Sequence, residues 1–140
     1  MRYLSIDLGD KRTGIAVGDD VSGIVTPREV LCVPIKPTPG RLLDAIGSCI
    51  DDYGPDALVL GLPLHMDGSE GERTKIVRSF GESLATRSGL AVQYQDERLT
   101  SADAEWTLAG SGKTHRQKKA LRDALAAAAI LRDFLERENA

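Results

Sequence analysis

The sequence predicts an α/β fold, a mixed five-stranded sheet with helices on both faces. Three strand-like segments follow one another closely near the N-terminus, which favours antiparallel hairpin pairing. Beyond them helical and strand-like segments alternate, as they do where helices cross between parallel strands. The chain has 140 residues, 41% hydrophobic and 28% charged, so it is long enough for one domain over residues 1–140 and too apolar for disorder throughout.

The first three segments carry the alternation of β-strands. Residues 2–8 place three aliphatic side chains on one side and a set ending in Asp7 on the other. Residues 13–18 resume as a strand after a short turn. Residues 24–33 are expected to form a third strand, but Pro27 interrupts it and indicates a bulge or an edge position. We therefore expect residues 2–8 at the centre of the sheet.

The remainder of the chain alternates between helices and strands. Apolar residues at helical spacing, closed by Gly or Pro, predict helices, and short apolar runs predict buried strands. In the second of these helices the apolar stripe begins at Ile76. In chain order we expect a helix over 41–53, a strand over 56–62, a helix over 70–87, a strand over 91–95, and helices over 100–109 and 114–137.

Composition and charge exclude several classes of protein. No apolar run approaches the ~20 residues of a membrane helix. Asp7 lies where a signal peptide would be apolar, so we expect a cytoplasmic protein. The net charge of −3 does not indicate a strongly basic nucleic-acid binder. Cys32 and Cys49 are expected to be buried thiols in a reducing compartment, and not a disulfide framework or a zinc site.

Acidic residues stand at the ends of two predicted strands. Asp7 ends an otherwise apolar strand, where a buried carboxylate needs a cation, a metal or hydrogen bonds to offset its desolvation. Its alternative role is to cap the turn at Gly9. Asp96 and Glu97 follow the last predicted strand, and adjacent carboxylates there point to different sides. The alternative for them is a solvated loop in which Glu97 pairs with the next arginine.

The last predicted helix carries a further acidic residue of interest, Asp123. At about 100° per residue, Asp123 shares a line with Ala127, Ile130 and Phe134, and so begins a second apolar stripe. The alternative is a charge at the stripe's edge, favoured slightly by the helix dipole. Residues 113–122, just before it, contain five cations and no acid. They form either a solvated helix start or a run that binds phosphates.

We expect three carboxylates, one from each of the two strand ends and one from the last helix, to converge at one edge of the sheet. Clustered carboxylates repel one another unless a cation lies among them. Oxygen ligands without accompanying Cys or His suit Mg²⁺ or Mn²⁺. Paired ions of this kind hydrolyse phosphodiesters, one activating water and the other stabilising the leaving oxygen. The residues therefore favour a metal-dependent nuclease.

Four stretches of the chain carry a resemblance to a known family. They are DLGDKRTGIAV at 7–17, GLPLHMDG at 61–68, DERLT at 96–100 and DALAA at 123–127. Together they resemble the YqgF family, the pre-16S rRNA nucleases also described as Holliday-junction resolvase-like proteins. The resemblance implies a ribonuclease H-like fold, metal-dependent nuclease activity and a role in maturing the end of precursor 16S rRNA.

By position, the resemblance implies that Asp7, Glu97 and Asp123 are the catalytic, metal-binding acids, with Mg²⁺ or Mn²⁺ as the cofactor. The middle ligand stays open between Asp96 and Glu97. The natural substrate stays open between structured RNA and branched DNA, and the oligomeric state is not predicted. Contacts to the nucleic acid are expected from Lys11, Arg12, Arg98, Lys113, Arg116, Lys118, Lys119 and Arg122.

Two other functions remain as alternatives. One is a nucleic-acid-binding factor without catalysis, acting in transcription or ribosome maturation. The other is a phosphotransferase of the actin and sugar-kinase type, whose first phosphate loop also resembles the turn after Asp7. Such proteins bind their nucleotide between two domains of this kind, and 140 residues supply one.

Overall fold

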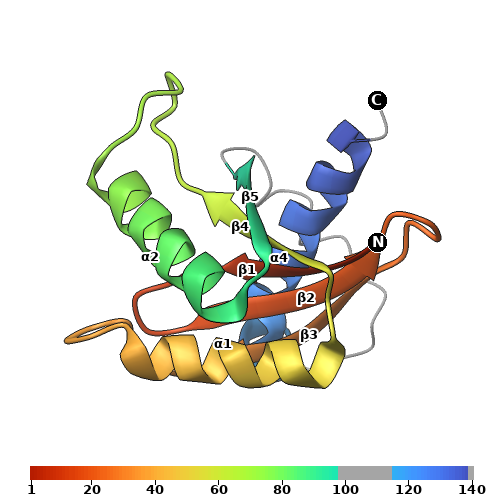
Figure 1. The fold of residues 1–140 in the computed structure, drawn as a ribbon, viewed down its shortest axis with the longest axis horizontal. Helices are drawn as coiled ribbons and strands as arrows, with labels where there is room; N and C mark the ends of the chain where they lie inside the picture. Colours follow the sequence, from red (N-terminus) through yellow and green to blue (C-terminus); the bar gives the residue numbers. More distant parts are fainter. Residues whose placement is uncertain (98–114, 139–140) are drawn as a thin grey trace.

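The computed structural model describes residues 1–97 and 115–138, with the side chains of the last helix from Leu121 onward. The five strands described form one sheet in the order β3-β2-β1-β4-β5 (Figure 1). These strands are β1 (Arg2–Asp7), β2 (Thr13–Asp19), β3 (Val25–Leu31), β4 (Ala57–Leu62) and β5 (Ala91–Asp96). The helices described are α1 (Gly40–Tyr53), α2 (Glu72–Ser88) and α4 (His115–Glu138).

β1 is the central strand, as its sequence pattern predicted. It runs antiparallel to β2 and parallel to β4, and β5 continues the sheet in parallel beyond β4. β3 lies at the opposite edge, where Ile15 pairs with Glu29 but Ala16 pairs with Pro27, leaving Arg28 as the extra residue of a bulge. Proline has no N–H to donate, and an edge bulge tolerates that loss. The mixed sheet and the edge position of Pro27 are therefore confirmed.

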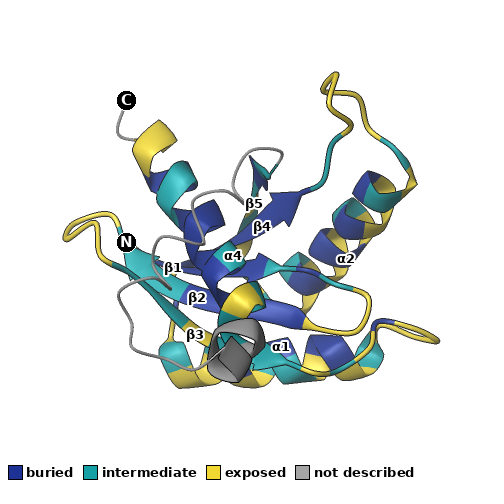
Figure 2. Ribbon diagram, turned by 180° about the vertical axis from the view of Figure 1, so that it is seen from behind, coloured by how far each residue is buried: buried dark blue, intermediate teal, exposed yellow. Residues whose placement is uncertain are grey.

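The two faces of the sheet are covered by different helices. α1 and α2 pack on one face and α4 on the other (Figure 1), and the inner strands β2, β1 and β4 between them are largely buried (Figure 2). Leu4 and Ile6 of β1 join α1 and α2 in one core that includes Phe80. Tyr3 joins the α4 core, where its ring meets Phe134 edge-on with centroids 5.3 Å apart. The alternation of β1 thus supplies both cores from one strand.

The N-terminal half of α4 lies very close to the sheet because the residues between them are small. Ala127 is fully buried, and its carbonyl oxygen accepts a 2.7 Å hydrogen bond from the hydroxyl of Ser5 in β1. A Cβ on Gly14 of β2 would lie 2.8 Å from the amide nitrogen of Ala124 and would collide with the carbonyl of Asp123. The helix is therefore seated on the sheet partly by backbone against backbone.

Two expectations about burial are wrong. Ile76 is 38% exposed, because the buried stripe of α2 runs through Thr74, Val77 and their successors one turn apart. Cys49 is buried, but Cys32 is exposed, since it comes directly after the end of edge strand β3; both are free thiols. The predicted helix over 100–109 lies outside the described residues. No helix in the described part of the chain is both long enough and apolar enough to cross a membrane.

Candidate active site

The structure brings Asp7, Glu97 and Asp123 to one edge of the sheet. Asp7 is the last residue of β1 and Glu97 directly follows β5, and the parallel strands between β1 and β5 point their carboxyl ends to this edge. Asp123 arrives from α4, where its backbone lies against Gly14, the residue that pairs with Asp7 across the sheet. Two strand ends and one helix therefore supply the three acids.

Gly61 of β4 leaves the space in which the Glu97 side chain lies. A Cβ on Gly61 would be 2.5 Å from Oε2 of Glu97 and 2.6 Å from Cδ1 of Ile130 in α4. The backbone N–H of Glu97 donates to the carbonyl of Leu62 at 3.3 Å, which holds the residue beside the same strand. The carboxylate of Glu97 is thus placed over β4, on the α4 side of the sheet.

Asp7 and Glu97 are close enough to share a hydrogen bond, in which the Asp7 carboxyl donates. Burial first, and then the charges of the Glu97 and Asp123 carboxylates, raise the pKa of Asp7 to about 7. Burial also raises the pKa of Glu97, while the hydrogen bond from Asp7 and the charge of Arg73 oppose that rise. Near neutral pH the Asp7 carboxyl, with its pKa near 7, is therefore only partly ionised, because two buried carboxylates in contact do not both ionise readily.

Asp123 is oriented differently from the other two acids. Its Oδ2 forms an ion pair with Nε of Arg12 at 3.3 Å. Among the described side chains, no three Asp, Glu, His or Cys residues lie close enough, as oriented, to hold one metal ion. The donors themselves are carboxylate oxygens, the ligands that Mg²⁺ and Mn²⁺ take. The residues thus fit a hard divalent cation in chemistry, and the orientation of Asp123 leaves the ligand set incomplete.

The structure also separates Glu97 from its neighbour Asp96. Tyr94 packs against α2, where a Cβ on Gly81 would lie 3.0 Å from the Tyr94 ring. Side chains alternate along a strand, so Asp96 continues the side of Tyr94 and faces α2. Glu97 lies on the other side, with Asp7. The geometry therefore favours Glu97 as the middle acid, and the charge of Asp96 contributes to raising the pKa of Glu97.

Arg73, in the first turn of α2, is the residue at this site that the sequence did not reveal. Its guanidinium donates to the carbonyl oxygen of Leu8 at 2.7 Å and forms an ion pair with Asp10. Its positive charge lowers the pKa of Asp7 and of Glu97, against the effect of burial. No local signal could have singled it out, because it is one of several charged residues in α2 and its partners lie more than sixty positions away.

The basic residues expected to contact nucleic acid are described only in part. Lys11, Arg12 and Arg122 are all exposed. Arg12 reaches the acids through its ion pair with Asp123. Arg98 and Lys113 lie outside the described residues, and the side chains of Arg116, Lys118 and Lys119 in α4 do as well.

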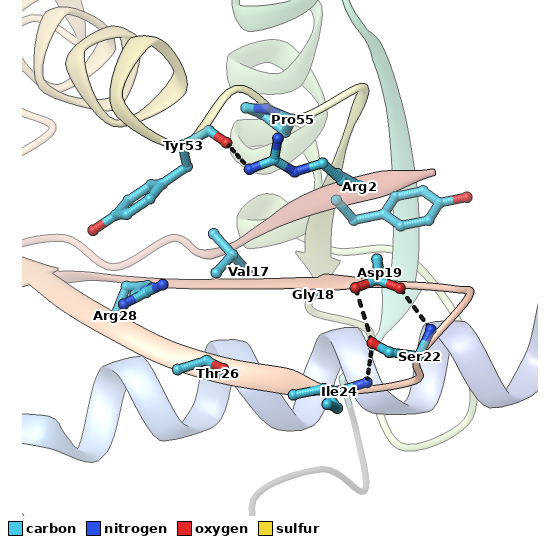
Figure 3. Close-up of a pocket in the computed structure, with 11 residues that line it drawn as sticks. Arg2, Val17, Gly18, Asp19, Ser22, Ile24, Thr26, Arg28, Tyr53 and Pro55 are labelled. Carbon is cyan, nitrogen blue, oxygen red and sulfur yellow. Dashed lines mark hydrogen bonds between the residues drawn. The ribbon is translucent and has the colours of Figure 1, made fainter.

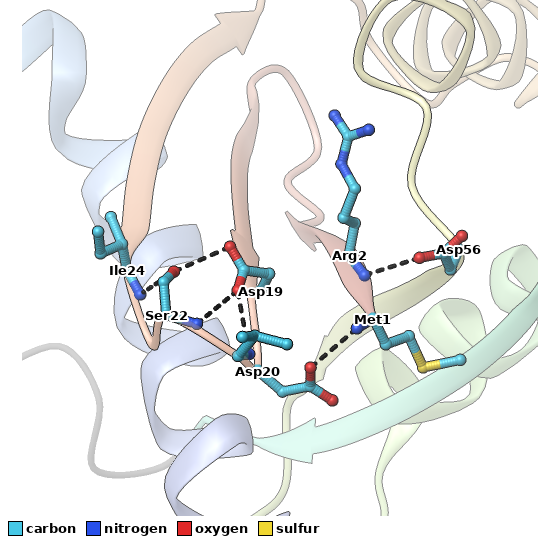
Figure 4. Close-up of polar contacts among 8 residues, drawn as sticks. Met1, Arg2, Asp19, Asp20, Ser22, Ile24 and Asp56 are labelled. Atoms are coloured by element: carbon cyan, nitrogen blue, oxygen red, sulfur yellow. Dashed lines mark hydrogen bonds and ion pairs between the residues drawn. The ribbon is translucent and has the colours of Figure 1, made fainter.

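A pocket near the start of β1, at the far end of the strand from the acids, has a different character (Figure 3). Arg2 donates to the backbone carbonyl of Tyr53 at 2.8 Å, and the guanidinium of Arg28 lies over the Tyr53 ring at 5.4 Å. Asp19 accepts hydrogen bonds from Ser22, and the N-terminal ammonium of Met1 is paired with Asp20 at 2.9 Å (Figure 4). The polar groups of this pocket largely satisfy one another, and its described lining offers no cluster of carboxylates.

Comparison with known proteins places the chain in a family. A family model described as RuvX, Holliday junction resolvase, matches residues 1–137. A curated protein of Lactococcus lactis subsp. lactis (strain IL1403), named as a pre-16S rRNA nuclease, is 40% identical over 136 residues, which cover 96% of this chain and 94% of the relative. A protein of the same name from Anaeromyxobacter sp. (strain K) is 40% identical over 137 residues, 98% of each chain.

Solved structures agree on the fold. The RuvC protein of T. thermophilus in complex with a Holliday junction substrate superposes with a TM-score of 0.64 at 18% identity, covering 100% of this chain and 98% of that one. The Fowlpox virus resolvase bound to Holliday junction DNA gives 0.64 at 13% identity, with 99% of each chain covered. These likenesses confirm the ribonuclease H-like fold expected from the sequence. With the family match spanning almost every residue, the chain belongs to the RuvX family, also called YqgF.

Proposed function

We propose that this protein is a cytoplasmic, metal-dependent nuclease that hydrolyses phosphodiester bonds in precursor 16S rRNA. The observation that carries the proposal is the buried contact between the carboxyls of Asp7 and Glu97, with Asp123 brought to them by α4. A folded protein gains no stability from repelling buried acids, so their assembly is expected to serve a ligand. The names of the curated relatives support the RNA substrate.

Each acid has a separate task in this proposal. Asp7 and Glu97 would hold a Mg²⁺ or Mn²⁺ ion once the proton on Asp7 has been released. Asp123 would complete the ligand set in place of its ion pair with Arg12, and the Arg12 guanidinium would then be available to a substrate phosphate. A bound ion would supply a water of lowered pKa and positive charge at the leaving oxygen. α4 and β4 keep bulk water from the buried side of the acids.

The direct test is cleavage of defined substrates by the purified protein. Precursor 16S rRNA and a four-way DNA junction are each incubated with the protein in Mg²⁺, in Mn²⁺ and in EDTA. We expect cleavage of the rRNA with either metal, none in EDTA, and none by Asp7→Asn. Asp51→Asn, which removes an exposed acid from α1, is the matched control and should cut normally.

Two other results would contradict the proposal in different ways. Tight binding of the rRNA without cleavage in any metal would support the non-catalytic binding factor instead. Cleavage of the junction alone would point to a resolvase, a second function favoured by the family's description and by the junction-bound structural neighbours.

The cationic start of α4 is proposed to bind backbone phosphates and not bases. No Phe, Tyr or Trp lies between positions 113 and 122, so the run lacks the large rings that stack on the bases of single strands. Replacing Lys118 and Lys119 by Ala should weaken binding to all sequences alike and reduce the salt slope by up to ~2, about one for each lost phosphate contact. The paired substitution of Lys36 and Lys75, exposed on the other side of the molecule, changes the net charge equally and should leave the slope unchanged. An equal effect of both pairs would show that only net charge matters.

A further inference from the structure

The first turn of α2 is tied to both loops that flank the end of β1. The hydroxyl of Thr74, which is 1% exposed, donates to the carbonyl of Pro63 in the loop after β4 and accepts the N–H of Gly71 at 3.1 Å. The next residue back, Arg73, reaches the opposite way, to the turn between β1 and β2. Two adjacent side chains therefore join one helix end to both loops.

The contacts of Arg73 fall on the turn that follows Asp7. One guanidinium nitrogen donates to the carbonyl of Leu8 at 2.7 Å, and another is paired with the carboxylate of Asp10. Between these two partners a Cβ on Gly9 would collide with the backbone three residues further on, so the turn is tightly wound. The planar fork of arginine presents several donors in a fixed geometry and engages both partners at once, which the single ammonium of lysine does less well.

We propose that Arg73 is a positioning residue for hydrolysis: by bridging the Leu8 carbonyl and Asp10, it fixes the turn after β1 and with it the placement of Asp7 and Arg12. This inference rests on the nuclease function proposed above and deepens it. Asp7 is joined by a peptide bond to Leu8, whose carbonyl Arg73 holds. Movement of the turn would therefore displace the Asp7 carboxylate. A displacement of ~1 Å in a reacting group can cost about 10²-fold in rate.

The position of the turn is measured first, without substrate or metal. Hydrogen–deuterium exchange is followed for the peptide covering residues 8–12 in the wild type and in Arg73→Gln. We expect exchange in this turn to be faster by about tenfold in the variant, with α1 and β4 unchanged, because two of the turn's tertiary contacts are lost. Arg78→Gln is the control: this arginine lies in the same helix and is paired with Glu70, away from the acids.

The kinetic test separates positioning from substrate binding. For Arg73→Gln we expect kcat to fall at least about tenfold while KM changes less than about twofold, and Arg73→Lys should recover part of the loss. Asp10→Asn removes the ion pair but keeps the contact of Arg73 with Leu8, so its kcat should lie between those of the wild type and Arg73→Gln. Arg78→Gln should retain both constants. Rates are corrected for the folded fraction, so lost stability alone would not lower kcat.

The outcomes distinguish this inference from the function on which it rests. If the wild type cuts neither substrate, the nuclease function is wrong, and the exchange comparison alone decides whether Arg73 holds the turn. If Arg73→Gln raises KM and leaves kcat intact, Arg73 binds substrate and the positioning role is wrong. Unchanged exchange in the turn, or a loss of kcat equalled by Arg78→Gln, would also overturn it.

Discussion

Replacing Asp7 with Asn should make the metal-free protein more stable, by an amount that depends on pH. The pKa of Asp7 is raised from 3.8 to about 7, and each pKa unit corresponds to about 1.4 kcal/mol, so ionised Asp7 costs the folded state up to about 4 kcal/mol. Part of this cost belongs to Glu97, which shares the proton. We therefore expect a gain of about 2–4 kcal/mol for Asp7→Asn above pH 7.

The sign follows from where the proton is held. Between about pH 4 and 7 the folded state keeps a proton on Asp7 that the unfolded state has released, so the wild type loses stability as pH rises through this window. The asparagine variant carries no such charge. The free energy of unfolding of Asp7→Asn should therefore exceed that of the wild type most near pH 8, and the difference should shrink to about 1 kcal/mol near pH 4.5.

Urea unfolding in EDTA at these two pH values measures the effect directly. The m-values should match between wild type and variant, so that the change is one of stability and not of the denatured state. Asp51→Asn should show no comparable gain at either pH. A variant no more stable than wild type at pH 8, or a gain equally large at pH 4.5, would refute the reasoning that Asp7 is buried at the expense of stability.

Three further substitutions test how the acids are held in place. Gly61→Ala should cost about 1–3 kcal/mol in urea unfolding and displace the Glu97 carboxylate, so that cleavage falls although no acid is changed. Ser5→Ala should cost about 0.5–1.5 kcal/mol in the same assay, since it removes the hydroxyl that donates to Ala127 while the Ala127 carbonyl keeps its bond within α4; a neutral result would mean that this contact does not stabilise the packing of α4 on β1. Gly14→Ala should be the most damaging of the three, at about 3 kcal/mol or more, because backbone cannot move aside; near-wild-type stability would show that α4 does not rest on this strand.

The features that the sequence predicted correctly are those that depend on the local pattern of residues. The alternation of residues 2–8 predicted a central strand, and Pro27 predicted a bulge or an edge position, because both follow from the period and hydrogen bonding of a strand. The line from Asp123 through Phe134 likewise marked the buried side of α4. These expectations needed no knowledge of distant contacts.

The features that escaped prediction depend on contacts between distant elements. Arg73 is important because α2 begins beside the turn after β1. The residues next to Arg73 in the sequence do not indicate this proximity. Gly61 lies within a stretch that was noted for its motif, but its role as space for Glu97 appears only when β4, β5 and α4 are assembled. Ile76 was misassigned because an exposed apolar residue at the rim of a stripe fits the same helical spacing as a buried one.

The packing of α4 on β1 joins the first strand to residues that are synthesised much later. The Ser5–Ala127 hydrogen bond joins positions 122 residues apart, so α4 packs on β1 only after residues 1–127 have been synthesised. In a growing chain Asp7 is therefore present long before Asp123 is added. Contacts of such long range also carry a loop-closure entropy that slows folding. The three acids are therefore brought together only after α4 has been made and has packed on the sheet, and a nascent chain that stops before Asp123 lacks the site.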